Sequence, residues 1–270
     1  HMIKLIASDM DGTLLNDRKE LPGDFFEVFD ELERRGIKFT VASGRSFDAV
    51  AHLFPEEYRT RLDFICDNGA NVIHEGKQVS VTPLDRPTFE QLIRACEDIG
   101  GLRILVCAGR GTYHLTADAE FSAEIAKYYK NHIPCDDLLS VDDVIYKLAV
   151  CDMKGTQQHA KPAIDAIFGD RLNVQVSGPI WMDVMGAGVS KGSALRALGK
   201  HLGISADDTM AFGDFYNDAD MLKYAGWSFA MENGNPDIKR MTRFLARSNN
   251  ENGVLRAIRQ YALQEDSIKQ

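Results

Sequence analysis

The sequence lacks several features that mark whole classes of protein. No apolar run reaches the roughly 18 residues that a membrane helix needs, so we expect no membrane span. Only five cysteines occur among 270 residues, and no two have a C-x-x-C spacing, which argues against a disulfide scaffold or a zinc knuckle. Charged residues interrupt the apolar start of the chain, so we expect no signal peptide and a cytoplasmic location.

Basic residues are also fewer than acidic residues. The chain has 31 Lys and Arg residues against 40 Asp and Glu residues, which gives a net charge of -9. Proteins that bind nucleic acid or anionic membranes present basic surfaces, so we expect neither partner. An acidic protein can still bind an anionic substrate, because a bound cation can invert the local charge.

Both ends of the chain carry the pattern of a parallel sheet covered by helices. Residues 3–8 and 37–42 are short apolar runs that predict strands, and apolar residues at helical spacing between them predict a helix. Strand, helix and strand within about 40 residues form a βαβ unit with parallel strands. The same pattern returns later in the chain, with a helix, two strands and a closing helix predicted at 191–202, 208–213, 227–231 and 251–263.

The middle of the chain has a different pattern, in which helices alternate with paired strands. This pattern indicates an α+β unit with a mostly antiparallel sheet. Helices are predicted at 88–99, 118–131 and 156–168, and strands at 102–107, 111–115, 145–151 and, as a pair, near 172–184. The segments entering and leaving this unit are rich in Gly, Pro and Ser, as linkers often are. We therefore expect an α/β core built from residues 1–82 and 185–270, with residues 83–184 inserted as a second domain.

Four groups of polar residues stand at predicted strand ends or helix starts. They are Asp9-Met10-Asp11-Gly12-Thr13, Ser43-Gly44-Arg45, Ser190-Lys191-Gly192 and Gly213-Asp214-Phe215-Tyr216-Asn217-Asp218. Open parallel sheets bind ligands at the carboxyl ends of their strands, where such groups would meet. Each group taken alone also fits an ordinary turn, a helix cap or a solvated lysine. Their joint occurrence favours a functional site.

The residue types in these groups suit a cation and a phosphate. Two carboxylates one residue apart, Asp9 and Asp11, repel each other unless a cation or a proton lies between them. Asp214 adds a further oxygen ligand of the kind that Mg²⁺ prefers. A hydroxyl next to an exposed amide, as at Ser43 and Gly44, suits a phosphate oxygen.

Together these motifs resemble those of the haloacid dehalogenase superfamily, specifically its Cof-like sugar-phosphatase branch. The matching strings are DMDGTLLN (9–16), VASGR (41–45), DNGA (67–70), VSKGSAL (189–195), GDFYNDADML (213–222), FAMENGNP (229–236) and NNENGV (249–254). The resemblance implies a Rossmann-like parallel sheet core with an inserted α+β cap domain at 83–184. It also implies a Mg²⁺-dependent phosphatase of small phosphorylated metabolites, above all sugar phosphates. No protein partner is implied.

The resemblance also assigns roles to individual residues. Asp9 would be the nucleophile that forms an aspartyl-phosphate, and Asp11 would act first as general acid and then as general base. Asp9, the Asp11 carbonyl and Asp214 would hold Mg²⁺. The phosphoryl oxygens would be bound by the Met10 amide, Ser43, Gly44, Lys191 and Asn217. Thr13 and Asp218 would contact the residues that bind the metal and the phosphate, not the substrate itself. Asp218 would orient Lys191 or the waters on the metal.

Further residues are candidates for contact with the rest of the substrate. They are Arg45 in the core and Lys147, Ser177, Gly178 and Trp181 in the cap. Trp181 also fits a core aromatic, an interpretation that is slightly favoured, and Lys147 also fits a snorkelling residue on an edge strand. Phe215 and Tyr216 depart from the small residue that the family commonly has after the motif aspartate, so we expect them to affect specificity.

Three other functions remain open at this stage. A phosphotransferase or phosphomutase of the same fold would use the same four motifs. A dehalogenase is disfavoured, because Lys191 and the GDFYND string suit a phosphate and a metal. A non-enzymatic sensor of phosphorylated metabolites is disfavoured because Asp9 and Asp11 are both present.

Overall fold

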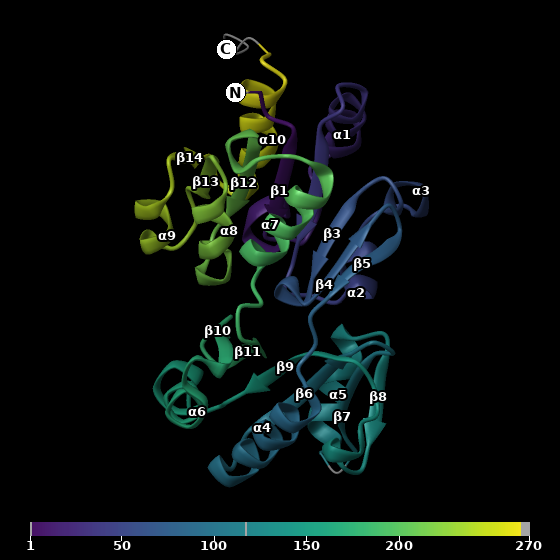
Figure 1. The fold of residues 1–270 in the computed structure, drawn as a ribbon, viewed down its shortest axis with the longest axis vertical. Coiled ribbons are helices and arrows are strands. Elements are labelled where there is room, and N and C mark those ends of the chain that lie inside the picture. Colours follow the sequence, from purple (N-terminus) through teal and green to yellow (C-terminus); the bar gives the residue numbers. More distant parts are fainter. Residues whose placement is uncertain (1, 117, 266–270) are drawn as a thin grey trace.

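The strands of the protein form two sheets at opposite ends of an elongated molecule (Figure 1). This computed structural model describes residues 2–116 and 118–265. Over those residues the first sheet has eight strands in the order β14-β13-β12-β1-β2-β3-β4-β5, and the second has six in the order β10-β11-β9-β6-β7-β8. The chain crosses to the second sheet after β5 and returns after β11, so the two ends of the sequence build the first sheet together (Figure 1).

The first sheet is parallel except at one edge. Strands β3, β4 and β5 pair antiparallel, whereas all the other neighbours in this sheet run parallel. Its strands are Leu5–Asp9 (β1), Lys38–Ala42 (β2), Asp63–Cys66 (β3), Asn71–His74 (β4), Lys77–Val81 (β5), Thr209–Gly213 (β12), Trp227–Met231 (β13) and Phe244–Ala246 (β14). Its helices are Phe25–Arg34 (α1), Phe47–Ala51 (α2), Glu56–Arg59 (α3), Lys191–Leu202 (α7), Ala219–Tyr224 (α8), Pro236–Met241 (α9) and Gly253–Ala257 (α10).

Helices cover both faces of the first sheet, which explains why β1 is buried along its whole length. Ile6 packs with residues of α1 and α10, including Leu32 and Val254. Its neighbour Leu5 points to the opposite face and packs with Leu195 of α7. A strand buried on both faces is held firmly in register, so the residues at its end are placed with precision.

The second sheet is antiparallel except for the pair β7 and β8. Its strands are Arg103–Ala108 (β6), Thr112–Leu115 (β7), His132–Cys135 (β8), Ile145–Cys151 (β9), Leu172–Val176 (β10) and Trp181–Gly186 (β11). Its helices are Arg86–Ile99 (α4), Ala119–Tyr128 (α5) and Lys161–Phe168 (α6). One face packs against α4 and α6 through a large apolar core, and the other carries a smaller cluster together with residues of α5.

The α/β class with a parallel core sheet is confirmed, and several local predictions need correction. The segment predicted as a helix over 118–131 ends with Tyr128, and β8 follows it; strands β3, β4, β5 and β14 were not predicted. Strand β11 extends to Gly186, two residues beyond the strand end predicted near 184. All five cysteines are free, as expected. Among the described residues, no helix has the length and apolar character that crossing a membrane requires.

Candidate active site

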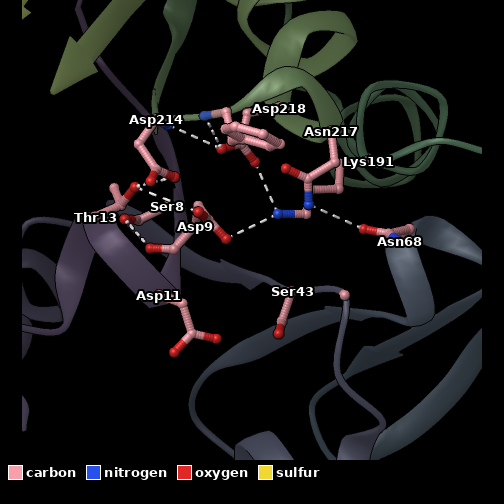
Figure 2. A network of polar contacts seen from close by, with 12 residues as sticks. Ser8, Asp9, Asp11, Thr13, Ser43, Asn68, Lys191, Asp214, Asn217 and Asp218 are labelled. Atoms are coloured by element: carbon pink, nitrogen blue, oxygen red, sulfur yellow. Dashed lines mark hydrogen bonds and ion pairs between the residues drawn. The ribbon is translucent and has the colours of Figure 1, made fainter. Parts of the chain in front are cut away.

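Three neighbouring parallel strands end at one edge of the first sheet and bring the polar motifs together. β1 pairs with β2 on one side and with β12 on the other. Asp9 is the last residue of β1, Ser43 follows β2 and Asp214 follows β12. Figure 2 shows these side chains around one small volume, although Asp9 and Asp214 lie far apart in the sequence.

The turn after β1 depends on a glycine. Gly12 has a φ of +73°, a conformation that disfavours other residues, and a Cβ there would lie 2.3 Å from Asp214 Oδ2. Next to it, the buried hydroxyl of Thr13 lies 3.3 Å from Asp9 Oδ2 and 3.2 Å from Asp214 Oδ1. The DGT string therefore lets the two carboxylates approach each other and gives them a shared hydrogen-bond donor.

Lys191 is fixed by the start of helix α7. Ser190 caps this helix, with its side chain accepting from the Ser193 amide while the Ser193 hydroxyl accepts from the Ser190 amide. The buried ammonium of Lys191 donates to Asp9 Oδ1 and to Asp218 Oδ1, each at 2.8 Å. Burial opposes a charge here, but Asp218 and Asp9 outweigh it and raise the pKa of Lys191 above its ordinary value. These two carboxylates also offset the unfavourable placement of a cation at a helix N-terminus.

Three carboxylates form a cluster that suits a cation. One ligand atom each from Asp9, Asp214 and Asp218 lie within 4.8 Å of one another. Burial, with a smaller contribution from Asp214, raises the pKa of Asp9 to about 7 against the opposing effect of Lys191. Burial likewise raises the pKa of Asp214, and it raises the pKa of Asp218 to about 6. One ammonium does not balance three carboxylates, so the donor set fits a hard divalent cation such as Mg²⁺.

Asp218 is the least available of these three ligands. Its Oδ1 accepts from Lys191, and its Oδ2 accepts from the backbone amide of Asp214 at 2.9 Å. Asp9 and Asp214 are therefore the better placed to bind a metal ion. Asp218 instead links the backbone of the motif at residues 213–218 to the Lys191 ammonium.

The side chain of Asp11 points away from Asp9 (Figure 2). Arg45 binds it through two contacts, at 3.0 Å from Nε and 2.7 Å from Nη2, and Lys19 Nζ lies 3.0 Å from Oδ1. Burial alone would raise the pKa of Asp11, but Arg45 and Lys19 outweigh it and hold that pKa below its ordinary value. Lys19 was missed from the sequence, because it reaches Asp11 only through a left-handed turn (φ 62°) that no motif marks.

The remaining core residues of the motifs line the same edge. Ser43 is buried, and its hydroxyl accepts from the Arg45 amide at 3.0 Å. Asn217 Nδ2 donates to Asn68 Oδ1 at 3.3 Å. The side chain of Met10 belongs to the apolar core, so only its backbone can serve the site. Asn68 was quoted within the DNGA string without a role, and the structure places it beside the site.

A polar bridge joins the two sheets next to this edge. Lys147 Nζ donates to the Gly44 carbonyl at 2.6 Å and lies 3.0 Å from Asp183 Oδ1, and Asn68 Nδ2 donates to Asp183 Oδ2 at 2.8 Å. Burial disfavours the charge on Lys147, but Asp183 outweighs it and raises the pKa of this lysine. The interpretation of Lys147 as an edge residue is wrong, because β9 lies between β11 and β6. Asp183 was missed, since one acid in an apolar strand gave no motif.

A cavity of about 1020 Å³ lies between the two sheets. Its wall includes the core residues Asp9, Asp11, Lys19, Ser43, Gly44, Arg45, Asp214, Phe215 and Asn217. From the other side come Arg103, Phe121, Tyr129, Lys147, Ala149, Cys151, Ser177, Trp181 and Asp183, among others. Trp181 both packs against Phe121 and lines this cavity. Within the described chain, Gly178 is not part of the wall, and its carbonyl instead accepts from Thr156 at 3.2 Å.

Comparison with known proteins identifies the family. The sequence profile described as haloacid dehalogenase-like hydrolase matches residues 6–258. The chain belongs to this family. The predicted membership is therefore confirmed, and so are the fold that it implied and the expectation that the protein is an enzyme.

Several named relatives of this haloacid dehalogenase-like hydrolase are phosphatases. The 5-amino-6-(5-phospho-D-ribitylamino)uracil phosphatase of Escherichia coli (strain K12) is 31% identical over 258 residues, which cover 95% of each chain. The HMP-PP phosphatase of Klebsiella pneumoniae (strain 342) is 28% identical, over 88% of this chain and 87% of its own. The prediction of a phosphatase is thereby confirmed. The substrate, the metal and the roles of single residues stay predictions.

Solved structures agree with this placement. The crystal structure of SMU.1108c from Streptococcus mutans UA159 matches with a TM-score of 0.89 at 28% identity, covering 97% of this chain and 100% of that one. A haloacid dehalogenase-like hydrolase from B. subtilis matches with a TM-score of 0.84 at 24% identity, over 95% and 99% of the two chains. The second likeness is one of fold alone.

Proposed function

We propose that the protein is a Mg²⁺-dependent phosphatase that acts on small phosphorylated metabolites through a covalent intermediate on Asp9. One observation carries this proposal: the buried Asp9 carboxylate lies between the Lys191 ammonium, at 2.8 Å, and the Asp214 carboxylate. A nucleophile held next to both a cationic anchor and a metal ligand suits attack on a phosphate. Phosphoryl transfer needs mainly positioning and charge stabilisation, and both are built into this arrangement.

The reaction takes two steps. In the first, an Asp9 oxygen forms a bond to phosphorus, the bond to the leaving alcohol oxygen breaks, and Asp11 gives that oxygen a proton. In the second, a water molecule attacks the aspartyl-phosphate while Asp11 takes its proton, which releases phosphate and restores Asp9. Arg45 and Lys19 hold Asp11 as a carboxylate, the form required of a base. These ion pairs must loosen, and Asp11 must take up a proton from the solvent, before it can act as an acid in the first step.

Residues from each motif would bind the negatively charged phosphoryl group. Lys191, Asn217, Ser43, Gly44 and the Met10 amide would bind its oxygens, and Asp218 keeps Lys191 oriented through the contact at 2.8 Å. Asp9, the Asp11 carbonyl and Asp214 would hold Mg²⁺. When bound, the ion supplies positive charge that offsets the repulsion between the attacking carboxylate and the phosphate. Thr13 keeps Asp9 and Asp214 side by side.

The segment 83–184 serves, in this proposal, as a cap over the site. It supplies Lys147, Ser177 and Trp181 to the wall of the cavity, and the polar bridge through Lys147 holds it against the core. Closing a site in this way excludes water and provides contacts to the leaving group. Two named relatives act on small phosphorylated compounds, which supports this substrate class. Sugar phosphates belong to the same class.

The proposal is tested by phosphate release from a panel of phosphorylated metabolites, with Mg²⁺ and after treatment with EDTA. We expect the wild-type protein to release phosphate only when Mg²⁺ is present. Asp9→Asn should lower the rate by about a thousandfold or more, because the amide cannot form the covalent intermediate. Circular dichroism and thermal melting of the variant show whether its fold is retained.

Asp170→Asn is a matched control, because it removes an exposed carboxylate that is not among the residues lining the cavity. It should release phosphate at the wild-type rate. Normal turnover by Asp9→Asn would show that the nucleophile is another group. Full activity after EDTA treatment would show that phosphate release does not require a divalent metal ion.

A further inference from the structure

A second cavity, of about 200 Å³, adjoins the edge of the first sheet where the polar motifs meet. We call it the smaller cavity, and the one of about 1020 Å³ the larger cavity. The wall of the smaller cavity includes Lys191 and Asn217 from the edge, Tyr216 beside them, and Asn173 and Gln175 from β10. β10 is the outermost strand of the second sheet, and alternation along it places Asn173 and Gln175 on the same face.

Side-chain hydrogen bonds separate the smaller cavity from the larger one. Asn217 lines both cavities, and its Nδ2 donates to Asn68 Oδ1 at 3.3 Å (Figure 2). Asn68 Nδ2 in turn donates to Asp183 Oδ2 at 2.8 Å. Of the residues that the structure describes, Asn68 lines only the smaller cavity and Asp183 only the larger one. A molecule in the smaller cavity therefore does not take the place of a substrate in the larger one.

Several polar atoms of this wall are left without a partner among the described residues. The amide oxygens Gln175 Oε1 and Asn217 Oδ1 accept no hydrogen bond there, although the nitrogens of both side chains donate. Asp220 accepts from the Ser190 hydroxyl through Oδ2, which leaves Oδ1 free within that part of the chain. Lys223, also in the wall and exposed, forms no ion pair with another described residue.

These free atoms select a class of ligand. Three oxygen acceptors and one ammonium require a ligand that donates several hydrogen bonds and accepts at least one, which hydroxyl groups do. The carboxylate of Asp220 repels an anion, and the ammonium of Lys223 repels a metal cation. The wall therefore fits a neutral compound that carries several hydroxyl groups.

Tyr216 adds an aromatic surface to the smaller cavity. Its hydroxyl donates to Asp237 Oδ2 at 2.5 Å, and its ring packs edge to face against Phe215, with centroids 5.2 Å apart. These contacts hold the ring in place, and 43% of the residue stays exposed. Phe215 lines the larger cavity and Tyr216 the smaller one. The ring can pack against the carbon atoms of a compound whose hydroxyls face the amides.

The volume limits the size of the ligand. A space of about 200 Å³ equals the volume of about seven molecules of liquid water. A compound of roughly 6–10 non-hydrogen atoms fits this space, which corresponds to a polyol of about three to five carbons.

We propose that the smaller cavity is a second binding site, for a small neutral polyol without a phosphate. Its hydroxyls bind Gln175, Asn217 and Asp220, and its carbon atoms pack against Tyr216. The bound polyol contacts Asn217 and Lys191 from the side away from the larger cavity. The inference goes beyond the proposed phosphatase function, and its test requires no turnover.

The test measures the binding of erythritol to the whole protein by isothermal titration calorimetry and by ligand-observed NMR, with no substrate present. We expect saturable binding with a Kd on the order of 1 mM, as suits a ligand of about eight non-hydrogen atoms. Gln175→Ala and Tyr216→Ala should each weaken binding by about fivefold or more, because each removes a contact to the ligand. Tyr216→Phe keeps the ring and should bind almost as well as the wild type. Ala219→Leu fills the same cavity without removing a contact and should also weaken binding.

Two control variants locate the binding. Gln157→Ala removes an exposed glutamine that lines neither cavity, and Trp181→Ala alters the wall of the larger cavity alone. Both should bind erythritol as the wild type does. Thermal melting of every variant shows whether its fold is retained. Glycine, a zwitterion of similar size, tests whether Asp220 and Lys223 together select a charged ligand instead.

Three results would overturn the inference. One is the absence of saturable erythritol binding up to about 100 mM, a hundred times the expected Kd. Another is binding that Trp181→Ala abolishes and that Gln175→Ala, Tyr216→Ala and Ala219→Leu leave intact, which would place erythritol in the larger cavity. The third is binding of glycine without binding of erythritol. Failure to release phosphate from any ester would end the phosphatase proposal and leave these binding results as they are.

Discussion

Asp67 is a buried carboxylate that lacks the hydrogen bonds by which buried carboxylates usually offset the loss of water, within the described part of the chain. Its side chain is fully buried, and neither of its oxygens has a hydrogen-bond partner in the described part of the chain. Burial, partly opposed by the charge on Lys147, raises the pKa of Asp67 to about 7. The residue lies beside the polar bridge between the sheets. Its burial without hydrogen bonds lowers the free energy of unfolding.

We predict that Asp67→Asn stabilises the protein above neutral pH. A carboxyl whose pKa is raised by folding favours the folded state below its unfolded pKa and loses that contribution as the pH rises through about 7. Asparagine has no such ionisation and accepts the positive φ of 50° at this position. Urea unfolding at pH 8 should show a gain of about 1–3 kcal/mol in the free energy of unfolding, and at pH 5 a smaller one.

The exposed residue Asp170 again provides the comparison. Asp170→Asn should leave the pH dependence of stability as it is in the wild-type protein. A difference between Asp67→Asn and the wild type that stays constant from pH 5 to pH 8 would contradict the prediction.

Single residues differed in how far the sequence could predict them. The positions of Asp9 and Lys191 were predictable, because Asp9 ends a strand and Lys191 begins a helix, each within a recognisable string. Asn68, Asp183 and Lys19 were not, because their roles depend on partners from distant segments. No local pattern encodes a contact such as that between Asn68 and Asp183, 115 positions apart.

At the scale of elements, helix α7 connects stability to the site. Its first residue is Lys191, and its start is fixed by the reciprocal hydrogen bonds between Ser190 and Ser193. The Ser190 hydroxyl also donates to Asp220 at 2.5 Å, which joins α7 to α8. The capped end therefore determines where the ammonium of Lys191 lies.

We predict that Ser190→Ala weakens both stability and catalysis. Loss of the cap should lower the free energy of unfolding by about 1 kcal/mol, measured by urea unfolding. The frayed first turn should also lower kcat for phosphate release, because Lys191 is then less well placed. Ser190→Thr keeps a capping hydroxyl and should recover most of both losses. Equal effects of the two substitutions would indicate that the cap is not the cause.

The elements themselves were predictable where periodicity was long or strong. The helix over 191–202 and the strand over 227–231 match α7 and β13 to the residue. Strands β3, β4 and β5 were missed because they are only four or five residues long and form a meander at the sheet edge. Strand β8 contains Pro134 and follows a helix directly, and both features hide a strand in a sequence pattern.

At the scale of the whole molecule, side-chain contacts join the unit with the first sheet to the unit with the second sheet at more than one place. Besides the polar bridge through Lys147, Asn131 Nδ2 donates to Asp48 Oδ2 at 2.6 Å, and Lys130 contacts His52. Asp48 and Asn131 are both exposed. Such contacts can open and close without disturbing the core of either sheet.

We predict that fixing these two surfaces together slows turnover. A double variant, Asp48→Cys and Asn131→Cys, is joined with a short bismaleimide and assayed for phosphate release. The linked protein should lose about tenfold or more in kcat, because product cannot leave while the cavity stays closed. The unlinked double variant and each single variant treated with the reagent should remain active, since four of the five natural thiols are buried. Undiminished kcat in the linked protein would show that no opening is needed.

The pairing of β1 with β12 has a consequence for how the protein is made. Ribosomes add about 5–20 residues per second, so Asp214 is synthesised roughly 10–40 seconds after Asp9. During that time every strand of the second sheet, from Arg103 to Gly186, has emerged as one continuous stretch, while β1 still lacks a neighbour on one side. The nascent chain can therefore finish the inserted unit first. A chain that stops before β12 lacks two of the three carboxylates of its acidic cluster, Asp214 and Asp218, and should show no hydrolytic activity.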